Sequence, residues 1–93
     1  MNIMVKSIKK RDGRIVLYDE SKIASAVLKA MKAAGEGDAT DAAQVANDVH
    51  MELEKLPEDM PPQIEQVQDA VERELMKNGF EQSAKKFILY RAK

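Results

Sequence analysis

The sequence predicts a small α+β domain in which a β-hairpin covers a cluster of four helices. Three observations support this prediction. Residues 1–18 alternate in the manner of β-strands around an Asp-Gly pair, and the remaining chain has four stretches with apolar residues at helical spacing. A length of 93 residues is enough for one compact core but not for two. We therefore expect residues 1–93 to form a single domain.

The hairpin is predicted over residues 4–18, with its turn at Asp12-Gly13. Asp-Gly is typical of a two-residue type I′ turn, in which both central residues have positive φ. Such a turn would direct four side chains toward the helices, namely Ile8, Lys10, Ile15 and Leu17, and would place Ser7, Lys9, Val16 and Tyr18 on the other face. An inward Lys10 would need an anion or access to solvent, because a buried unpaired ammonium is costly.

The first two helices follow the hairpin. Asp19 is suited to cap the start of the first helix and Gly35 to end it. The second helix is predicted over residues 41–55, because it must end before Pro57. The apolar stripes that should face the core are Ile23, Val27, Leu28 and Met31 in the first helix, and Ala42, Val45, Ala46, Val49 and Leu53 in the second.

Two further helices are predicted in the second half of the chain. Pro61 and Pro62 suit the first turn of the third helix, which should end at Asn78-Gly79, and a short extended piece near Met60 could add a third strand. The last helix is predicted over residues 80–92. The inward stripes should be Ile64, Val67, Val71 and Leu75 in the third helix, and Ala84, Phe87, Ile88 and Arg91 in the last.

Composition excludes several classes of function. The net charge of −1 is too small for the whole molecule to attract nucleic acid or an anionic membrane. The absence of cysteine excludes disulfides, cysteine-based zinc sites and a thiol nucleophile, and no stretch is long and apolar enough to span a bilayer. We expect a soluble, cytoplasmic protein without a metal site or catalytic residues, with His50 as a surface residue.

Basic residues gather at two places that a hairpin packed beside the last helix would bring together. Lys9, Lys10, Arg11 and Arg14 surround the predicted turn, and Arg91 and Lys93 lie at the C-terminal end. Together they could form a phosphate site, with lysines as point charges and arginines as forked donors. The alternative is a solvated loop and a frayed terminus.

Two segments resemble the ATP-cone family, a regulatory nucleotide-binding module found mostly at the N-terminus of ribonucleotide reductases. Residues 9–23 read KKRDGRIVLYDESKI, and residues 84–93 read AKKFILYRAK. They are similar to the family's basic K-R-D-G turn, its F/Y-D before a K-I helix start, and its terminal I-L-Y-R helix. The ending is most similar to the anaerobic and cobalamin-dependent classes, and the resemblance covers essentially the whole chain.

The resemblance implies roles for individual residues. Lys10 and Arg11 would bind the triphosphate, the backbone from Lys9 to Val16 would contact the adenine, and Glu65 aligns with a position that senses the sugar. Asp19 and Lys22 would contact base or ribose, and Lys93 phosphate. With Arg91 from the basic C-terminal group, the candidate nucleotide-binding residues are Lys9, Lys10, Arg11, Asp12, Gly13, Val16, Asp19, Lys22, Glu65, Arg91 and Lys93.

The implied function is allosteric control of a reductase by bound ATP or dATP, which Mg²⁺ could accompany, with no reaction in this segment itself. The partner would be a catalytic domain or a neighbouring subunit. One alternative is a domain that binds a protein or DNA through the basic hairpin tip, although an aromatic content of 4% offers little surface for base stacking. Another is a cone that has lost its nucleotide, because Pro61 stands where several relatives have threonine.

Overall fold

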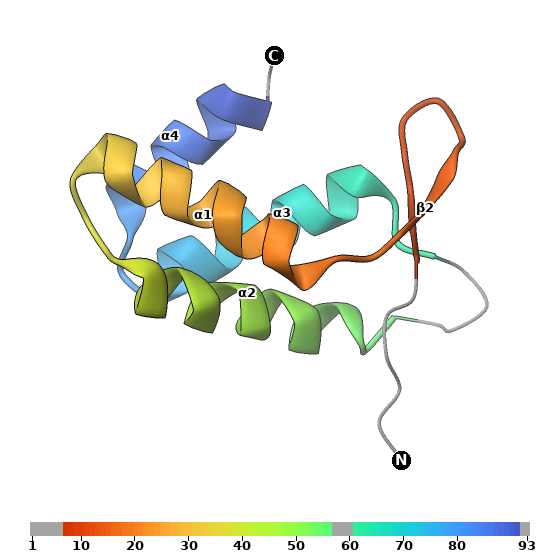
Figure 1. Cartoon of the computed structure of the whole chain (residues 1–93), viewed down its shortest axis with the longest axis horizontal. Helices are drawn as coiled ribbons and strands as arrows, with labels where there is room; N and C mark the ends of the chain where they lie inside the picture. Colours follow the sequence, from red (N-terminus) through yellow and green to blue (C-terminus); the bar gives the residue numbers. More distant parts are fainter. Residues whose placement is uncertain (1–6, 57–60, 92–93) are drawn as a thin grey trace.

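The structure, a computed structural model, describes residues 7–56 and 61–91. Its elements in chain order are β1 (Ser7–Lys9), β2 (Ile15–Leu17), α1 (Glu20–Ala34), α2 (Ala39–Leu53), α3 (Ile64–Lys77) and α4 (Glu81–Arg91). The predicted α+β class is confirmed, with the antiparallel hairpin placed beside the end of the bundle at which α1 and α3 begin (Figure 1). The predicted hairpin start at Met4, the strand near Met60 and the position of Lys93 lie outside the described residues.

The hairpin turn has three loop residues instead of two. The Lys10 amide donates to the Arg14 carbonyl (2.8 Å), and the Gly13 amide donates to the Lys10 carbonyl (3.0 Å). Gly13 has a φ of 90°, whereas no non-glycine residue of the described chain has positive φ, Asp12 included. The predicted type I′ turn is therefore wrong, and the loop is a tight turn closed by a left-handed glycine.

The extra loop residue shifts the strand register and reverses the faces of β2. Ile8 pairs with Val16, and both lie toward the core. Ile15 and Leu17, which were predicted to face the helices, are exposed, Leu17 by 85%. A shift of one residue moves every side chain of a strand to its other face. Lys10 was predicted to face inward like Ile8, but it is exposed because it lies beyond the end of β1, at the hairpin loop.

The starts of α1 and α2 are set by aspartate caps. Asp19 caps α1, and Gly35 ends it in the left-handed conformation, as predicted. The second helix begins at Ala39, two residues before the predicted start at Asp41. Asp38 and Asp41 form a reciprocal capping box, in which the side chain of each accepts the other's backbone amide at 2.9 and 3.1 Å. Asp41 thus lies within the first turn.

The third helix begins after both prolines, so the prediction that they form its first turn is wrong. Gln63 precedes the helix, and its backbone amide donates to the Gln66 side chain at 2.8 Å. The Pro62 carbonyl accepts the Lys9 amide at 2.9 Å, and Lys9 and Gln63 form an isolated parallel bridge. The segment before α3 is extended because it pairs with the hairpin.

The core lies between the four helices. The first helix packs against α2 and α4, and α3 packs against the same two helices (Figure 1). The predicted stripes of α1 and α2 face inward, although Leu28 is only partly buried. In α4, Ser83, Ala84 and Phe87 are buried, whereas Ile88 is 47% exposed, which corrects its predicted inward position. An eleven-residue helix packed on one side buries a narrow stripe.

Candidate functional site

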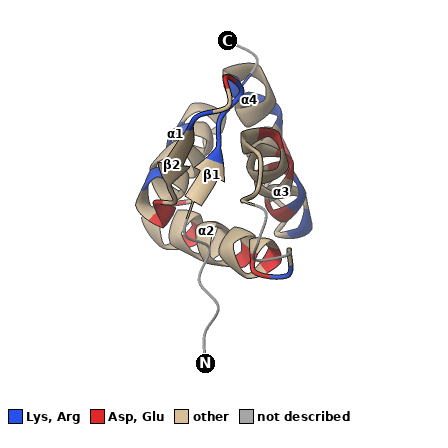
Figure 2. Ribbon diagram, turned by 90° about the vertical axis from the view of Figure 1, so that its right-hand side faces the viewer, with Lys and Arg blue, Asp and Glu red and all other residues tan. Residues whose placement is uncertain are grey.

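A shallow hollow of about 270 Å³ lies between the hairpin loop and the start of α3. Its lining residues are Lys10, Arg11, Asp12, Arg14 and Ile64. The loop supplies the charges because its short turn exposes all four polar side chains, and α3 supplies the apolar wall. Figure 2 shows the basic residues of the hairpin at the end away from the N-terminus. The hollow therefore combines three cationic groups with an apolar surface.

Both arginines of the loop already bind carboxylates. The Arg14 side chain donates from Nε to Oδ2 of Asp12 at 2.6 Å, within the loop itself. The Arg11 side chain donates from Nε to Oε1 of Glu65 at 2.9 Å, which joins the loop to the first turn of α3. The Arg11 and Glu65 side chains are 60% and 45% exposed, so this ion pair contributes little to stability.

The lysines near the loop differ from these arginines. Lys9, Lys10 and Lys22 are exposed, and none of them forms an ion pair with a residue in 7–56 or 61–91. Lys22 lies in the first turn of α1, where exposed backbone amides add positive potential. An anion could therefore bind these three ammonium groups without displacing a carboxylate of the part of the chain that the structure describes.

The basic end of α4 also meets α3. Arg91 donates to Asp69 at 2.8 Å and to Glu72 at 2.5 Å, and its side chain is only 16% exposed. Burial is the largest single effect and lowers the pKa of Arg91, but the hydrogen bonds to Asp69 and Glu72 and the negative charges of these two residues together raise it above its usual value. Glu65 and Asp69 are four residues apart and share one helix face. The predicted basic groups thus reach neighbouring turns of α3, where carboxylates bind their arginines.

Asp19 and Val16 have structural contacts that account for their positions. The Asp19 carboxylate accepts hydrogen bonds from the hydroxyl of Ser21 at 2.5 Å and from its amide at 3.0 Å. These hydrogen bonds hold the pKa of Asp19 below its usual value. Asp19 remains exposed, whereas the Val16 side chain is partly buried and packs toward the core.

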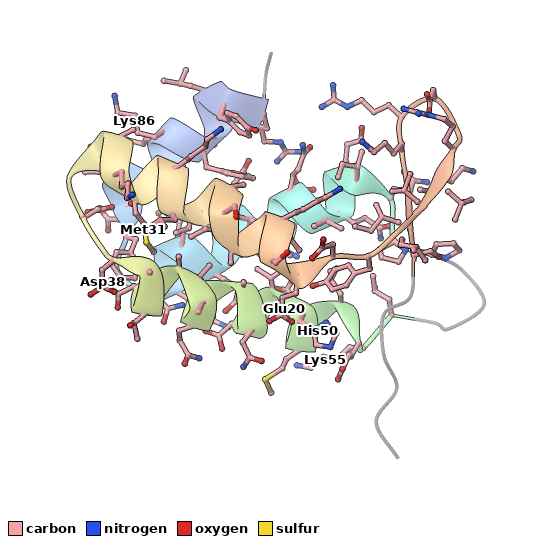
Figure 3. All side chains as sticks on the ribbon, viewed as in Figure 1. Glu20, Met31, Asp38, His50, Lys55 and Lys86 are labelled. Atoms are coloured by element: carbon pink, nitrogen blue, oxygen red, sulfur yellow. The ribbon has the colours of Figure 1, made fainter. Side chains whose placement is uncertain are left out.

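A polar cluster that sequence reasoning missed surrounds His50. Its Nε2 lies 2.7 Å from Glu54 and its Nδ1 3.7 Å from Glu20, and its ring is 5.4 Å from that of Tyr18. Figure 3 shows Glu20 and His50 together, where the start of α1 faces α2. The predicted surface position is wrong, because α1 and the end of the hairpin leave His50 only 16% exposed. The signal in the sequence was Glu54, four residues after His50.

Burial raises the pKa of Tyr18 well above its usual value, and its buried hydroxyl has no hydrogen-bond partner among the described residues.

Within residues 7–56 and 61–91, no group of three histidine or carboxylate side chains is arranged to hold a metal ion. None of the helices in these ranges is long and apolar enough to cross a membrane.

The sequence of the chain is similar to a known domain family and to segments of larger enzymes. The family model described as "ATP cone domain" matches residues 6–93. The chain is 38% identical over 95 residues to the vitamin B12-dependent ribonucleoside-diphosphate reductase of Thermoplasma acidophilum, and 36% identical over 88 residues to the anaerobic ribonucleoside-triphosphate reductase of Salmonella typhimurium. These alignments cover 97% and 95% of this chain but only 12% of each relative. The corresponding enzyme of Escherichia coli is 35% identical over 88 residues.

Proposed function

The chain belongs to the ATP-cone domain family, and from this premise we propose that residues 1–93 form one allosteric domain that binds ATP or dATP and controls a ribonucleotide reductase. The observation that supports a nucleotide site in this chain is the hollow at the hairpin loop, where Lys10, Arg11 and Arg14 lie around an apolar wall formed by Ile64. A triphosphate needs cations, and a base needs apolar surface.

In the proposed binding mode, the phosphates lie against the loop cations. Lys10 supplies a point charge that no carboxylate of the described chain holds, and the arginine side chains supply further donors. The adenine contacts the loop backbone and apolar side chains, and Mg²⁺ could accompany the phosphates. The residues assigned to the proposed site are Lys9, Lys10, Arg11, Asp12, Gly13, Val16, Asp19, Lys22, Glu65, Arg91 and Lys93.

Control of an enzyme requires that the bound nucleotide favour one arrangement of the assembly over another. The partner would be the catalytic domain of a reductase or a neighbouring subunit, because the chain spans 12% of the reductases it matches. No bond of the nucleotide is broken in this proposal, since the domain acts through binding alone.

Calorimetric titration of the protein with ATP, dATP and GTP, each with and without Mg²⁺, tests the proposal. We expect saturable binding of an adenine nucleotide and weaker binding of GTP. The absence of heat for ATP and dATP at millimolar concentration would contradict a nucleotide-binding function and would favour a structural or protein-binding role.

A further inference from the structure

We propose that Glu65 is a built-in competitor for the phosphates, a carboxylate that occupies Arg11 until a polyphosphate displaces it. This inference rests on the proposed nucleotide site and assigns a regulatory residue within it. It changes the expected role of Glu65, because a residue that contacts the sugar would strengthen nucleotide binding, whereas a competitor weakens it.

The geometry places Glu65 against the cation that the ligand needs. The Arg11 Nε donates to Glu65 Oε1 at 2.9 Å, and Arg11 lines the hollow together with Ile64, the residue that precedes Glu65. An anion in the hollow therefore lies beside a guanidinium that a carboxylate already holds. The carboxylate must give up its hydrogen bond, or share the guanidinium, before Arg11 can bind phosphate in full.

The exposure of both side chains indicates that a competing anion can replace Glu65 on Arg11. Both side chains of the Arg11–Glu65 pair are about half exposed, whereas the Arg91 side chain that binds Asp69 and Glu72 is 16% exposed. An exposed ion pair is weak, because water screens the charges and can replace the hydrogen bond. A polyphosphate carries several negative charges against one on Glu65, so it should win the competition for Arg11.

The exchange is local because β1 is attached to the segment before α3 independently of Arg11. The Lys9 amide donates to the Pro62 carbonyl at 2.9 Å, which holds β1 against the segment before α3 whether or not Arg11 binds Glu65. Lys10 is exposed beside Arg11 and makes no ion pair within the described chain, so it can hold an arriving phosphate while Arg11 changes partner.

Titration of the wild type and of Glu65→Gln with ATP and with inorganic tripolyphosphate tests the inference. Glutamine keeps the size of the side chain and removes its charge. We expect both ligands to bind the variant about three- to tenfold more tightly, since a weak ion pair and a like-charge repulsion are removed. Tripolyphosphate reports on phosphate binding alone, because it has neither sugar nor base.

A double-mutant cycle supplies the control for a general change in charge. If Glu65 acts through Arg11, then Glu65→Gln should change affinity much less in an Arg11→Ala background. If Glu65→Gln increases ligand affinity equally in both backgrounds, the inference is overturned, because the Glu65 charge would then act on the ligand directly and not through Arg11.

The outcomes also separate the inference from the proposed function. If Glu65→Gln binds ATP more weakly but binds tripolyphosphate as the wild type does, Glu65 contacts the sugar, and only the competitor role is overturned. Unchanged affinity for both ligands would also overturn the competitor role and leave the proposed function standing. If neither ligand binds the wild type or the variant, both the inference and the proposed function fail.

Discussion

Lys9 and Lys10 carry the same charge in adjacent positions, but their surroundings differ. Lys10 lines the hollow beside the loop arginines, whereas Lys9 belongs to β1 and uses its backbone amide to bind Pro62. The alternation of the sequence predicted that Lys10 faces inward and needs an anion. In the structure Lys10 instead lines the hollow from the exposed, loop end of the hairpin.

Lys10→Ala should weaken ATP binding by about 10- to 100-fold, because a hydrogen bond to a charged group contributes roughly 1.5 to 3 kcal/mol. Lys9→Ala is the matched control, since it removes the same charge one residue away, and it should have a much smaller effect. Calorimetry of the two variants measures the difference. Equal losses would mean that the loop acts as a diffuse positive field rather than as a specific phosphate site.

Glu74 is a buried carboxylate between α2 and α3. Burial is the main reason that its pKa is raised, and a hydrogen bond with Glu52 adds to the effect, while Lys77 at 3.6 Å opposes it. A raised pKa means that the folded state favours the protonated form. The resulting stability is therefore present below the usual pKa of a glutamate and is lost as the pH rises through the raised value.

Glu74→Gln should therefore stabilise the protein at pH 7 and have less effect near pH 3, which is below the usual pKa of a glutamate, so that the carboxyl is protonated in both the folded and the unfolded state. The amide can still donate to Glu52. We expect the melting temperature of the variant to lie above that of the wild type at pH 7, measured by circular dichroism, and the difference to be smaller near pH 3. A difference that does not change between pH 3 and pH 7 would contradict a raised pKa of Glu74 in the folded state.

At the scale of the elements, the hairpin depends on the backbone conformation of one residue, Gly13. Gly13 has a φ of 90°, and a Cβ added there would meet no atom within 4 Å. The requirement for glycine is therefore one of backbone conformation and not of space. Because the loop has three residues, Gly13 also sets the register that places Ile8 and Val16 toward the core.

Gly13→Val should strain the loop by roughly 1 to 3 kcal/mol, because a β-branched residue resists positive φ. Gly13→Asn should cost less, since asparagine adopts left-handed conformations more readily. We expect the valine variant to lose both thermal stability and ATP affinity, with the asparagine variant in between. If the valine variant matches the wild type in both measurements, the three-residue loop is wrong.

At the scale of the whole molecule, the proposed site joins parts that are distant in the chain. The loop of the hairpin and the first turn of α3 are connected through Arg11 and Glu65, which are separated by 54 positions. A ligand in the hollow contacts both parts and should stabilise the folded state as a whole, because the unfolded chain does not hold these parts together.

ATP should raise the melting temperature of the protein. A ligand present at about 100 times its dissociation constant adds roughly 2.7 kcal/mol to the free energy of unfolding, which corresponds to about 10 °C or more for a domain of this size. The shift should be smaller for Lys10→Ala at the same ATP concentration. A melting temperature that stays constant up to millimolar ATP, with or without Mg²⁺, would contradict the proposed function.

The sequence alone determined the features that depend on neighbouring residues. The α+β class, the four helices, the cap at Asp19, the stop at Gly35 and most of the core stripes follow from local spacing and from side chains that bind their own backbone. The basic loop could also be identified, because lysines and arginines beside an Asp-Gly pair are visible without any tertiary contact.

Only the tertiary structure decided the orientation of the hairpin and the partners of its charges. One additional loop residue exchanges the two faces of β2. Local propensity does not distinguish a two-residue from a three-residue loop at Asp12-Gly13. The pairing of Arg11 with Glu65 and of Arg91 with Asp69, and the burial of His50, require elements that are far apart in the chain. Such contacts depend on how the helices pack, and no spacing within a single segment specifies them.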